Sequence, residues 1–150
     1  MTIKKVFLLV VCACVCIVCS TYAADISVSV NGEPLICDAS PVIRNDRVLV
    51  PMRTVFEALG CDVSYNEEFD GAYVYASKDK ELIVHKIGSD SIFVNGDTVP
   101  MDVSSEIISG RTLVPLRAVS EALGCDVSWN PEEYSVSVEY IKSDFFEKNT

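Results

Sequence analysis

The chain has 150 residues, of which 22 are acidic and 12 are lysine or arginine, so its net charge is −10. An acidic surface repels other polyanions, which excludes nucleic acid and anionic lipid as expected partners. The length suits one domain, and the three cysteines beyond residue 23 are too few, and odd in number, for a small scaffold held by disulfides.

The N-terminus has the layout of a secretory signal peptide, expected at residues 1–23. Lys4 and Lys5 form a short basic start, and an uncharged, largely apolar stretch runs from there to Ala23 and Ala24. Cleavage after Ala23 removes both lysines and no acidic residue, which changes the net charge from −10 to −12. The alternative is a retained N-terminal membrane anchor or a lipoprotein, because the uncharged stretch just reaches the length of a membrane span. We therefore expect a secreted or extracellular-surface protein without membrane contact after cleavage.

Beyond this segment the chain repeats itself. Residues 31–66 recur as residues 95–130 with a constant offset of 64 positions, and 20 of the 36 positions are identical. A long internal repeat indicates a duplicated structural unit. One unit alone would have a thin core, so we expect the two halves to share one core within a single domain. The expected boundaries are residues 24–140 for the domain, about 26–76 for repeat 1, about 82–140 for repeat 2 and 141–150 for a C-terminal tail.

Each repeat is expected to begin with a strand and a tight hairpin. Apolar residues alternate with serine over residues 26–30, which predicts a half-buried strand. Asn-Gly follows at residues 31–32 and again at 95–96, and this dipeptide favours a type I′ turn because both residues tolerate positive φ. After the returning strand, extended runs at residues 48–50 and 112–114 lead into a proline.

That proline, Pro51 or Pro115, is expected at the first position of a short helix, where it loses no hydrogen bond. Each helix is expected to run to about residue 59 or 123, and Gly60 and Gly124 supply the left-handed stop. The apolar faces of the two helices are expected to consist of Val55, Ala58 and Leu59, and of Val119, Ala122 and Leu123.

After each helix the sequence returns to the period of a strand. Residues 62–66 and 126–130 alternate, and closing strands are expected at residues 72–76 and 134–140. A further strand at residues 82–87 bridges the two repeats. The expected fold class is α+β: an antiparallel, β-rich single domain of two pseudo-symmetric repeats, each with one short helix packed on sheet.

The repeated signature reads VNG, then Asp, Ile and Arg-x-Leu-Val-Pro-x-Arg, then Glu-Ala-Leu-Gly. The second copy carries its two longest motifs at residues 111–117 and 121–124, and the first copy carries them at 47–53 and 57–60. The signature resembles that of the copper amine oxidase N-terminal domain-like family, also called stalk domains, over about residues 26–140. The resemblance implies a secreted or surface protein of a Gram-positive bacterium, with antiparallel sheet wrapped around short helices.

The family name does not imply copper chemistry in this chain. In the amine oxidases, copper and the tyrosine-derived quinone belong to a separate, larger catalytic domain, and copper there needs a cluster of histidines. This chain contains one histidine, His85, which we expect to be a partly exposed strand residue. We therefore expect no enzyme activity, no cofactor, and no catalytic, cofactor-binding or metal-ligating residue.

Arginine and glutamate are spaced i, i+4 in each expected helix, as Arg53 with Glu57 and Arg117 with Glu121. Side chains at this spacing are neighbours on the helix surface. They either bind a ligand or form an internal ion pair that locks the helix to the sheet, and their presence in both copies favours the second interpretation. The expected structural signature consists of Arg53, Glu57, Gly60, Arg117, Glu121 and Gly124.

The cysteines beyond the expected signal peptide are Cys37, Cys61 and Cys125. Cys61 and Cys125 occupy equivalent positions, where the family that the chain resembles more often has alanine. Small, buried and inert thiols are the favoured interpretation. A Cys61–Cys125 disulfide is the alternative, and it requires Cα atoms within about 7 Å of each other. The sequence leaves the redox state of all three open.

Two classes of function follow from these features. The favoured one is a non-catalytic, secreted or cell-surface binding or spacer module that engages a cell-wall polymer, a glycan or another surface protein. Its candidate contact residues are aromatic, although cross-strand packing is the stronger explanation for them: Phe69, Tyr73, Tyr75 and Tyr134. The alternative is a secreted enzyme or enzyme inhibitor with an unrecognised site, which a deep polar pocket or His85 beside a cysteine would favour. The ligand and the oligomeric state stay open.

Overall fold

The computed structural model describes residues 25–141. The expected signal peptide and the C-terminal tail beyond residue 141 lie outside this range. Repeat 1 and the bridging segment contain β1 (Ser27–Val30), β2 (Glu33–Pro34), β3 (Val42–Arg44), β4 (Arg47–Pro51), α2 (Met52–Ala58), β5 (Asp62–Glu68), β6 (Gly71–Lys78) and β7 (Glu81–Lys86). Repeat 2 contains β8 (Ser91–Val94), β9 (Asp97–Pro100), β10 (Glu106–Ile108), β11 (Arg111–Pro115), α3 (Leu116–Ala122), β12 (Cys125–Asn130) and β13 (Ser135–Tyr140).

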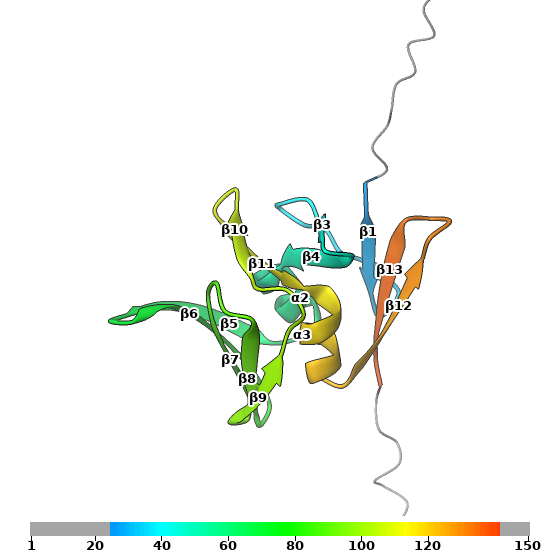
Figure 1. Ribbon diagram of the computed structural model, residues 1–150. Helices are drawn as coiled ribbons and strands as arrows, with labels where there is room; N and C mark the ends of the chain where they lie inside the picture. The colour runs from blue at the N-terminus through cyan, green and yellow to red at the C-terminus, as the bar shows by residue number, and fades with distance from the viewer. Residues whose placement is uncertain (1–24, 142–150) are drawn as a thin grey trace, which may run out of the picture.

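These elements form three sheets around two central helices (Figure 1). The first outer sheet has the strand order β12-β13-β1-β2, the central sheet β10-β11-β4-β3, and the second outer sheet β5-β6-β7-β8-β9. Helix α2 contacts β4, β5 and β11, while α3 contacts β4, β9, β11 and β12. Each helix therefore packs on strands of its own repeat and on a strand of the other.

Within residues 25–141, every pair of neighbouring strands is antiparallel except one. The antiparallel, β-rich α+β class expected from the sequence is therefore confirmed. The exception is the pairing of β1 with β13, which are parallel, with Ser27 opposite Ser135 and Val30 opposite Val138. Residue alternation predicts that a segment is a strand but carries no information about its partner, so this pairing was not expected.

The two repeats meet in the middle of the central sheet, where β4 pairs with β11. Val50 lies opposite Val114, and Leu49 lies opposite Pro115. Val50 and Val114 occupy equivalent positions in the two copies, 64 residues apart. Both valines are completely buried, so the centre of this pairing is also part of the core.

The outer sheets mix the repeats as well. The first outer sheet joins β12 and β13 of repeat 2 to β1 and β2 of repeat 1, and the second joins β5 and β6 of repeat 1 to β8 and β9 of repeat 2. The buried apolar residues accordingly form one cluster with members from both repeats, such as Phe56 and Val119. Because apolar burial is the main driving force of folding, this shared cluster ties the stability of each repeat to the other.

Local turn and helix-end signals in the sequence correspond closely to the structure. Asn31 and Asn95 adopt φ values of 51° and 53°, and the glycine after each also has positive φ, as the type I′ turn requires. Gly60 and Gly124, with φ of 84° and 73°, lie just beyond the helices and confirm the expected stop. Pro51, in contrast, ends β4 and precedes the helix as its N-cap, so the helix begins one residue later than expected.

The helix faces differ in part from the expectation. Val55 and Leu59 are buried as expected, but Ala58 is exposed, and Met52 and Phe56 complete the buried face of α2. The expected face rested on the most apolar stripe of the segment. The sheets contact α2 on more than one side, so the buried surface of the helix is wider than that stripe.

Candidate functional site

His85 lies on β7 with no exposed surface, so the expectation of a partly exposed residue is wrong. Its Nδ1 lies 3.0 Å from the carbonyl oxygen of Ser91, and its Nε2 lies 2.7 Å from Oγ of Ser105. A carbonyl only accepts, so Nδ1 donates its proton to it; in the neutral ring, Nε2 then accepts from the Ser105 hydroxyl. Ser105 Oγ also accepts a hydrogen bond of 2.8 Å from the backbone N–H of Gly88.

Both nitrogens of the His85 imidazole are therefore paired. Burial lowers the pKa of His85, while the hydrogen bond to Ser91 opposes that shift. The two ring nitrogens hold β7 to the start of β8, through Ser91, and to the loop between β9 and β10, through Ser105. The recorded partners are serine and backbone groups rather than any of the cysteines. His85 is therefore a structural residue.

The three cysteines are free thiols in the structure. Cys61 and Cys125 are buried, as expected, and Cys37 is half-buried. Burial raises the pKa of each thiol, with Asp38 adding to the effect at Cys37. A thiol with a raised pKa is a weak nucleophile, because the thiolate is the reactive form.

The arginine–glutamate pairs of the helices lie on the surface, so the expected internal ion pairs are wrong. Arg53 Nη1 lies 4.0 Å from Glu57 Oε1, and Arg117 Nε lies 3.9 Å from Glu121 Oε1. All four side chains are more than half exposed. Helical spacing correctly predicts that the partners are neighbours, but it does not report which side of the helix faces the core.

A second pair of arginines makes closer contacts, and these connect the two repeats. Arg47 Nη2 lies 2.6 Å from Oδ2 of Asp102, and Arg111 forms the equivalent ion pair with Asp38. Each arginine thus binds the aspartate of the other repeat. The hydrogen bond from Arg111 lowers the pKa of Asp38. The sequence motif contains both residue types, but nothing in their spacing predicts that they pair between repeats.

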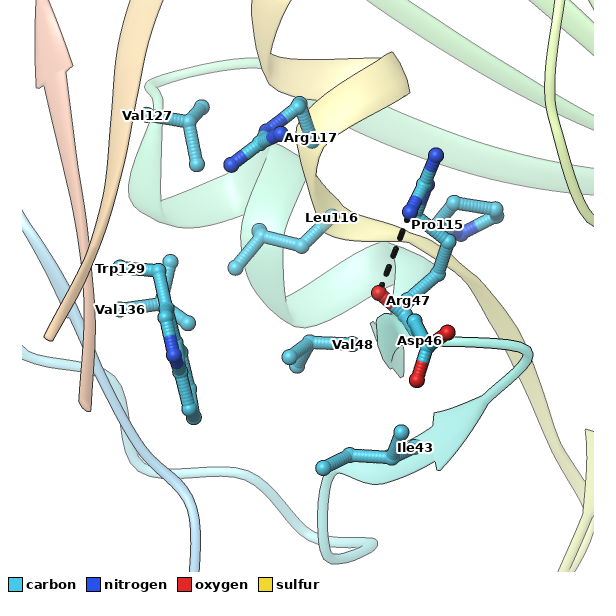
Figure 2. A pocket seen from close by; sticks show the side chains of 10 residues that line it. All are labelled: Ile43, Asp46, Arg47, Val48, Pro115, Leu116, Arg117, Val127, Trp129 and Val136. Atoms are coloured by element: carbon cyan, nitrogen blue, oxygen red, sulfur yellow. Dashed lines mark hydrogen bonds between the residues drawn. The ribbon is translucent and has the colours of Figure 1, made fainter. Parts of the chain in front are cut away.

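The chain forms two grooves that are lined by equivalent residues. The first, which we name the Trp129 groove, has a cavity volume of about 290 Å³ and is lined by Ile43, Asp46, Arg47, Val48, Pro115, Leu116, Arg117, Val127, Trp129 and Val136 (Figure 2). The second, the Tyr65 groove, has a volume of about 720 Å³. Its lining includes Ile107, Gly110, Arg111, Thr112, Pro51, Met52, Arg53, Val63, Tyr65 and Ala72. These ten positions are the first ten shifted by 64 residues.

Two different sheets form the opposite walls of each groove. Trp129 lies on β12, at the edge of the first outer sheet, and Ile43 lies on β3, at the edge of the central sheet. In Figure 2 the indole is seen nearly edge-on, so one face is turned toward the space beside Leu116 and Val48. The ring of Tyr134 packs against Trp129 with a centroid distance of 5.5 Å and an interplanar angle of 74°. That contact holds the indole in place.

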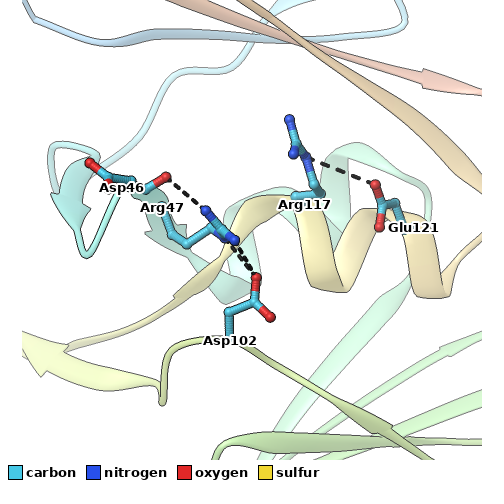
Figure 3. A network of polar contacts seen from close by, with 5 residues as sticks. All are labelled: Asp46, Arg47, Asp102, Arg117 and Glu121. Carbon is cyan, nitrogen blue, oxygen red and sulfur yellow. Dashed lines mark hydrogen bonds and ion pairs between the residues drawn. The ribbon is translucent and has the colours of Figure 1, made fainter.

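Arginine side chains form the polar rim of the Trp129 groove (Figure 3). Arg47 donates from Nε and Nη2 to Asp102, at 2.8 and 2.6 Å, and also bonds the carbonyl oxygen of Asp46. Arg117 points away from the helix beside Glu121. A neighbouring hollow of about 390 Å³ also includes Arg47 and Arg117 in its lining, so the two guanidinium groups lie between two depressions.

The aromatic residues expected to make contacts lie mainly outside the grooves. Tyr73 and Tyr75 are half-buried on β6, where their hydroxyls bond Asp70 and Glu68, and Phe69 is fully exposed at the end of the same hairpin. Residue alternation predicts only strand positions for Trp129 and Tyr65, so their place in the grooves was not expected. The available signal was that an aromatic residue occupies the same position in both copies.

The chain matches the family model described as "Copper amine oxidase N-terminal domain" over residues 29–138. The chain belongs to this family. The matched region contains most of both repeats, all the residues that line the two grooves, and the central sheet. No curated protein and no solved structure gives a significant match.

The residues of this copper amine oxidase N-terminal domain do not fit a copper centre. His85 is the only histidine of the chain, and both of its ring nitrogens are hydrogen-bonded inside the fold. Among residues 25–141, no three histidine, cysteine or acidic side chains are grouped so that they could hold a metal ion. In the same range, no helix is long and apolar enough to cross a membrane.

Proposed function

We propose that this domain is a non-catalytic binding or spacer module of a secreted or cell-surface protein, and that it engages a cell-wall polymer, a glycan or a surface protein. The observation that carries the proposal is that the same ten positions line two separate grooves. A groove volume of about 290 Å³ is close to the lower end of known ligand sites, which occupy roughly 300–1,000 Å³.

The exposed residues of the grooves are better explained by a role in binding than by a role in folding stability. Folding explains why Pro115 and Leu116 are buried in both copies, as Pro51 and Met52 are. It does not explain why Trp129, at 37% exposure, and Tyr65, at 51%, keep large aromatic rings at the surface. Aromatic side chains that remain exposed beside a hollow are typical of interaction sites.

The proposed lack of catalysis rests on the state of the reactive groups. The nitrogens of His85 are both paired, and the buried thiols of Cys61 and Cys125 have raised pKa values. The matched family model is that of an N-terminal domain, which agrees with a non-catalytic role. Nothing in the described residues favours the alternative of a secreted enzyme or an enzyme inhibitor.

We also propose that the repeats are related by an approximate twofold axis near Val50 and Val114. Two observations support it: the β4–β11 register joins equivalent positions, and Arg47–Asp102 is matched by Arg111–Asp38. The proposal predicts superposable repeats in an experimental structure. Repeats that do not superpose when related by such a rotation would contradict it.

A sedimentation assay with insoluble cell walls of Gram-positive bacteria tests the proposed function. The purified protein should be retained at low salt, and a variant with both Trp129→Ala and Tyr65→Ala should stay in solution. Phe69→Ala removes a fully exposed aromatic ring outside both grooves and should be retained like the original protein. No retention of the original protein, or equal retention of the double variant, would contradict the proposal.

The proposed location needs a separate test. The proposal is export directed by residues 1–23, with a retained N-terminal anchor as the alternative. N-terminal sequencing of the protein released by cells should give a chain that begins at Ala24. A protein found only in the membrane fraction with its first 23 residues intact would support the anchor instead.

A further inference from the structure

We propose that each groove is a subsite for one sugar ring of an uncharged saccharide chain, with Trp129 or Tyr65 as the stacking platform. This inference rests on the proposed binding function and names its ligand class. It is carried by three observations: the aromatic face in each groove, the mixture of donors and acceptors on the rim, and the balance of charge around it.

The aromatic wall suits a sugar ring. A pyranose has C–H bonds on its faces and hydroxyl groups around its edge, so it needs a flat apolar surface and a polar rim. Trp129 presents one face to the groove, and Tyr134 fixes the indole from another side. Val48 and Leu116 lie opposite that face and make the floor apolar.

The polar rim offers donors and acceptors side by side. A sugar hydroxyl both donates and accepts, and two neighbouring hydroxyls match a guanidinium group placed beside a carboxylate. Arg47 with Asp102 and Arg117 with Glu121 form two such pairs (Figure 3). The two arginines line the Trp129 groove, and the two carboxylates line the neighbouring hollow that shares these arginines. Arg117 and Glu121 are as far as 3.9 Å apart and more than half exposed, so their ion pair is weak. Sugar hydroxyl groups can therefore bond both side chains without breaking a strong interaction.

The charge balance excludes an anionic ligand as the preferred one. The two arginines of the Trp129 groove are balanced by Asp46 in the same groove and by their ion-pair partners Asp102 and Glu121, which line the neighbouring hollow. The whole chain is also acidic, with a net charge of −10. An anionic polymer would be repelled on approach, while an uncharged saccharide would not.

The duplication favours a repetitive ligand. The two grooves use the same ten positions, five of which hold identical residues, and both contain an aromatic ring and two arginines. Such grooves suit related chemical units, and a polysaccharide presents its unit many times along its chain. Binding at both grooves would raise the overall affinity without any new contact, because the second encounter is intramolecular.

Trp129 gives a direct measurement, because it is the only tryptophan of the chain and lies in a groove. We would titrate the purified protein with hexasaccharides of β-1,4-linked glucose, β-1,4-linked N-acetylglucosamine and α-1,4-linked glucose, and with hexagalacturonate as the charged counterpart. At least one uncharged hexasaccharide should change the tryptophan emission in a saturable way. Hexagalacturonate should bind at least about tenfold more weakly.

Matched variants assign the signal to the grooves. Trp129→Tyr should remove the emission change, and adding Tyr65→Trp in that background should restore it from the other groove. Arg117→Ala should weaken the binding measured through Trp129 by about tenfold. Phe69→Ala should leave the titration unchanged.

The outcomes separate this inference from the proposed function. Retention on cell walls with no emission change for any uncharged hexasaccharide would overturn the saccharide inference and leave the binding function standing. Tighter binding of hexagalacturonate would overturn it as well. Retention that is lost after protease treatment of the walls would overturn it too, because the ligand would then be a protein or peptide. Absence of both retention and emission change would overturn the proposed function together with the inference.

Discussion

The two outer sheets contain equivalent strands but differ by one insertion. The first joins β13 directly to β1 in parallel, whereas the second places β7 between β6 and β8 and is antiparallel throughout. Since β7 is antiparallel to both neighbours, β6 and β8 run in the same direction, as β13 and β1 do. Parallel neighbours cannot be joined by a short hairpin. The chain passes from β6 to β8 within one sheet, and β7 provides the antiparallel strand that connects them. Strands β1 and β13 lie at opposite ends of the described chain, so no connecting strand is required between them.

The interiors of the two repeats also differ at one equivalent position. Phe56 on α2 and Ser120 on α3 are 64 residues apart, and both are completely buried. Phe56 fills space with an aromatic ring, while Ser120 places a hydroxyl there, with no recorded hydrogen-bond partner for its Oγ. At this position, repeat 1 therefore contributes more apolar volume to the shared core than repeat 2 does.

The largest effect is expected from removing that ring. Phe56→Ala should lower the free energy of unfolding by about 3–5 kcal/mol, because it removes a fully buried aromatic side chain and leaves a cavity. Urea denaturation followed by circular dichroism would measure the loss. Because the core is shared, strands of both repeats should unfold in one transition. A second transition, retained by half of the chain, would show that the repeats are independent.

The next prediction concerns the hydrogen bonds of His85, which lies on the inserted strand β7. Ser105→Ala should cost about 1–3 kcal/mol at neutral pH, because it leaves His85 Nε2 and the N–H of Gly88 without a partner. Urea denaturation at pH 7.5 would measure the change. A cost near zero would mean that a water molecule replaces the hydroxyl.

The same histidine should make the second outer sheet sensitive to acid. Its pKa is lowered from 6.5 in the folded protein, so the unfolded chain takes up the proton first as the pH falls. Stability is therefore complete above about pH 6.5 and decreases as the pH falls toward the folded pKa. Denaturation between pH 7.5 and about pH 5 would measure the decrease, since most carboxylates titrate below that range. In His85→Gln the slope should disappear; an unchanged slope would assign it to other groups.

The sequence predicted local features well. Asn31-Gly32 and Gly60 gave the hairpin turn and the helix stop, because each depends on the backbone of one or two residues. The arginine–glutamate spacing predicted neighbours on a helix for the same reason. The antiparallel, β-rich class followed from residue alternation along the strands.

Features set by distant segments were not predicted. The burial of His85 depends on a loop around Ser105, 20 residues further on. The pair of Arg47 with Asp102 spans 55 residues, and the grooves lie between edges of different sheets. Such contacts follow from the packing of strands, which the period of a segment does not determine. The repeat itself was the one long-range signal, and it pointed to shared architecture without showing the two grooves.

A smaller effect, of opposite sign, is expected at Ser120. Ser120→Ala should raise the free energy of unfolding by about 1 kcal/mol, because it removes a buried hydroxyl that has no recorded partner and adds no volume. Urea denaturation of this variant and of Phe56→Ala in the same experiment would compare the two equivalent positions directly. A destabilising Ser120→Ala would mean that the hydroxyl is paired, for example with a buried water.

The smallest effects are expected at the helix ion pairs, where both repeats should behave alike. Replacing Arg53 or Glu57 by alanine should change stability by no more than about 0.5 kcal/mol, because the 4.0 Å pair is exposed and screened by solvent. A double-mutant cycle in low and high salt would measure the coupling energy, with Arg117 and Glu121 as the matched pair of the second repeat. An internal pair would instead cost about 3–5 kcal/mol when one partner is removed. A coupling near that value would mean that these arginines hold the helices, and they could not then be free to bind a ligand.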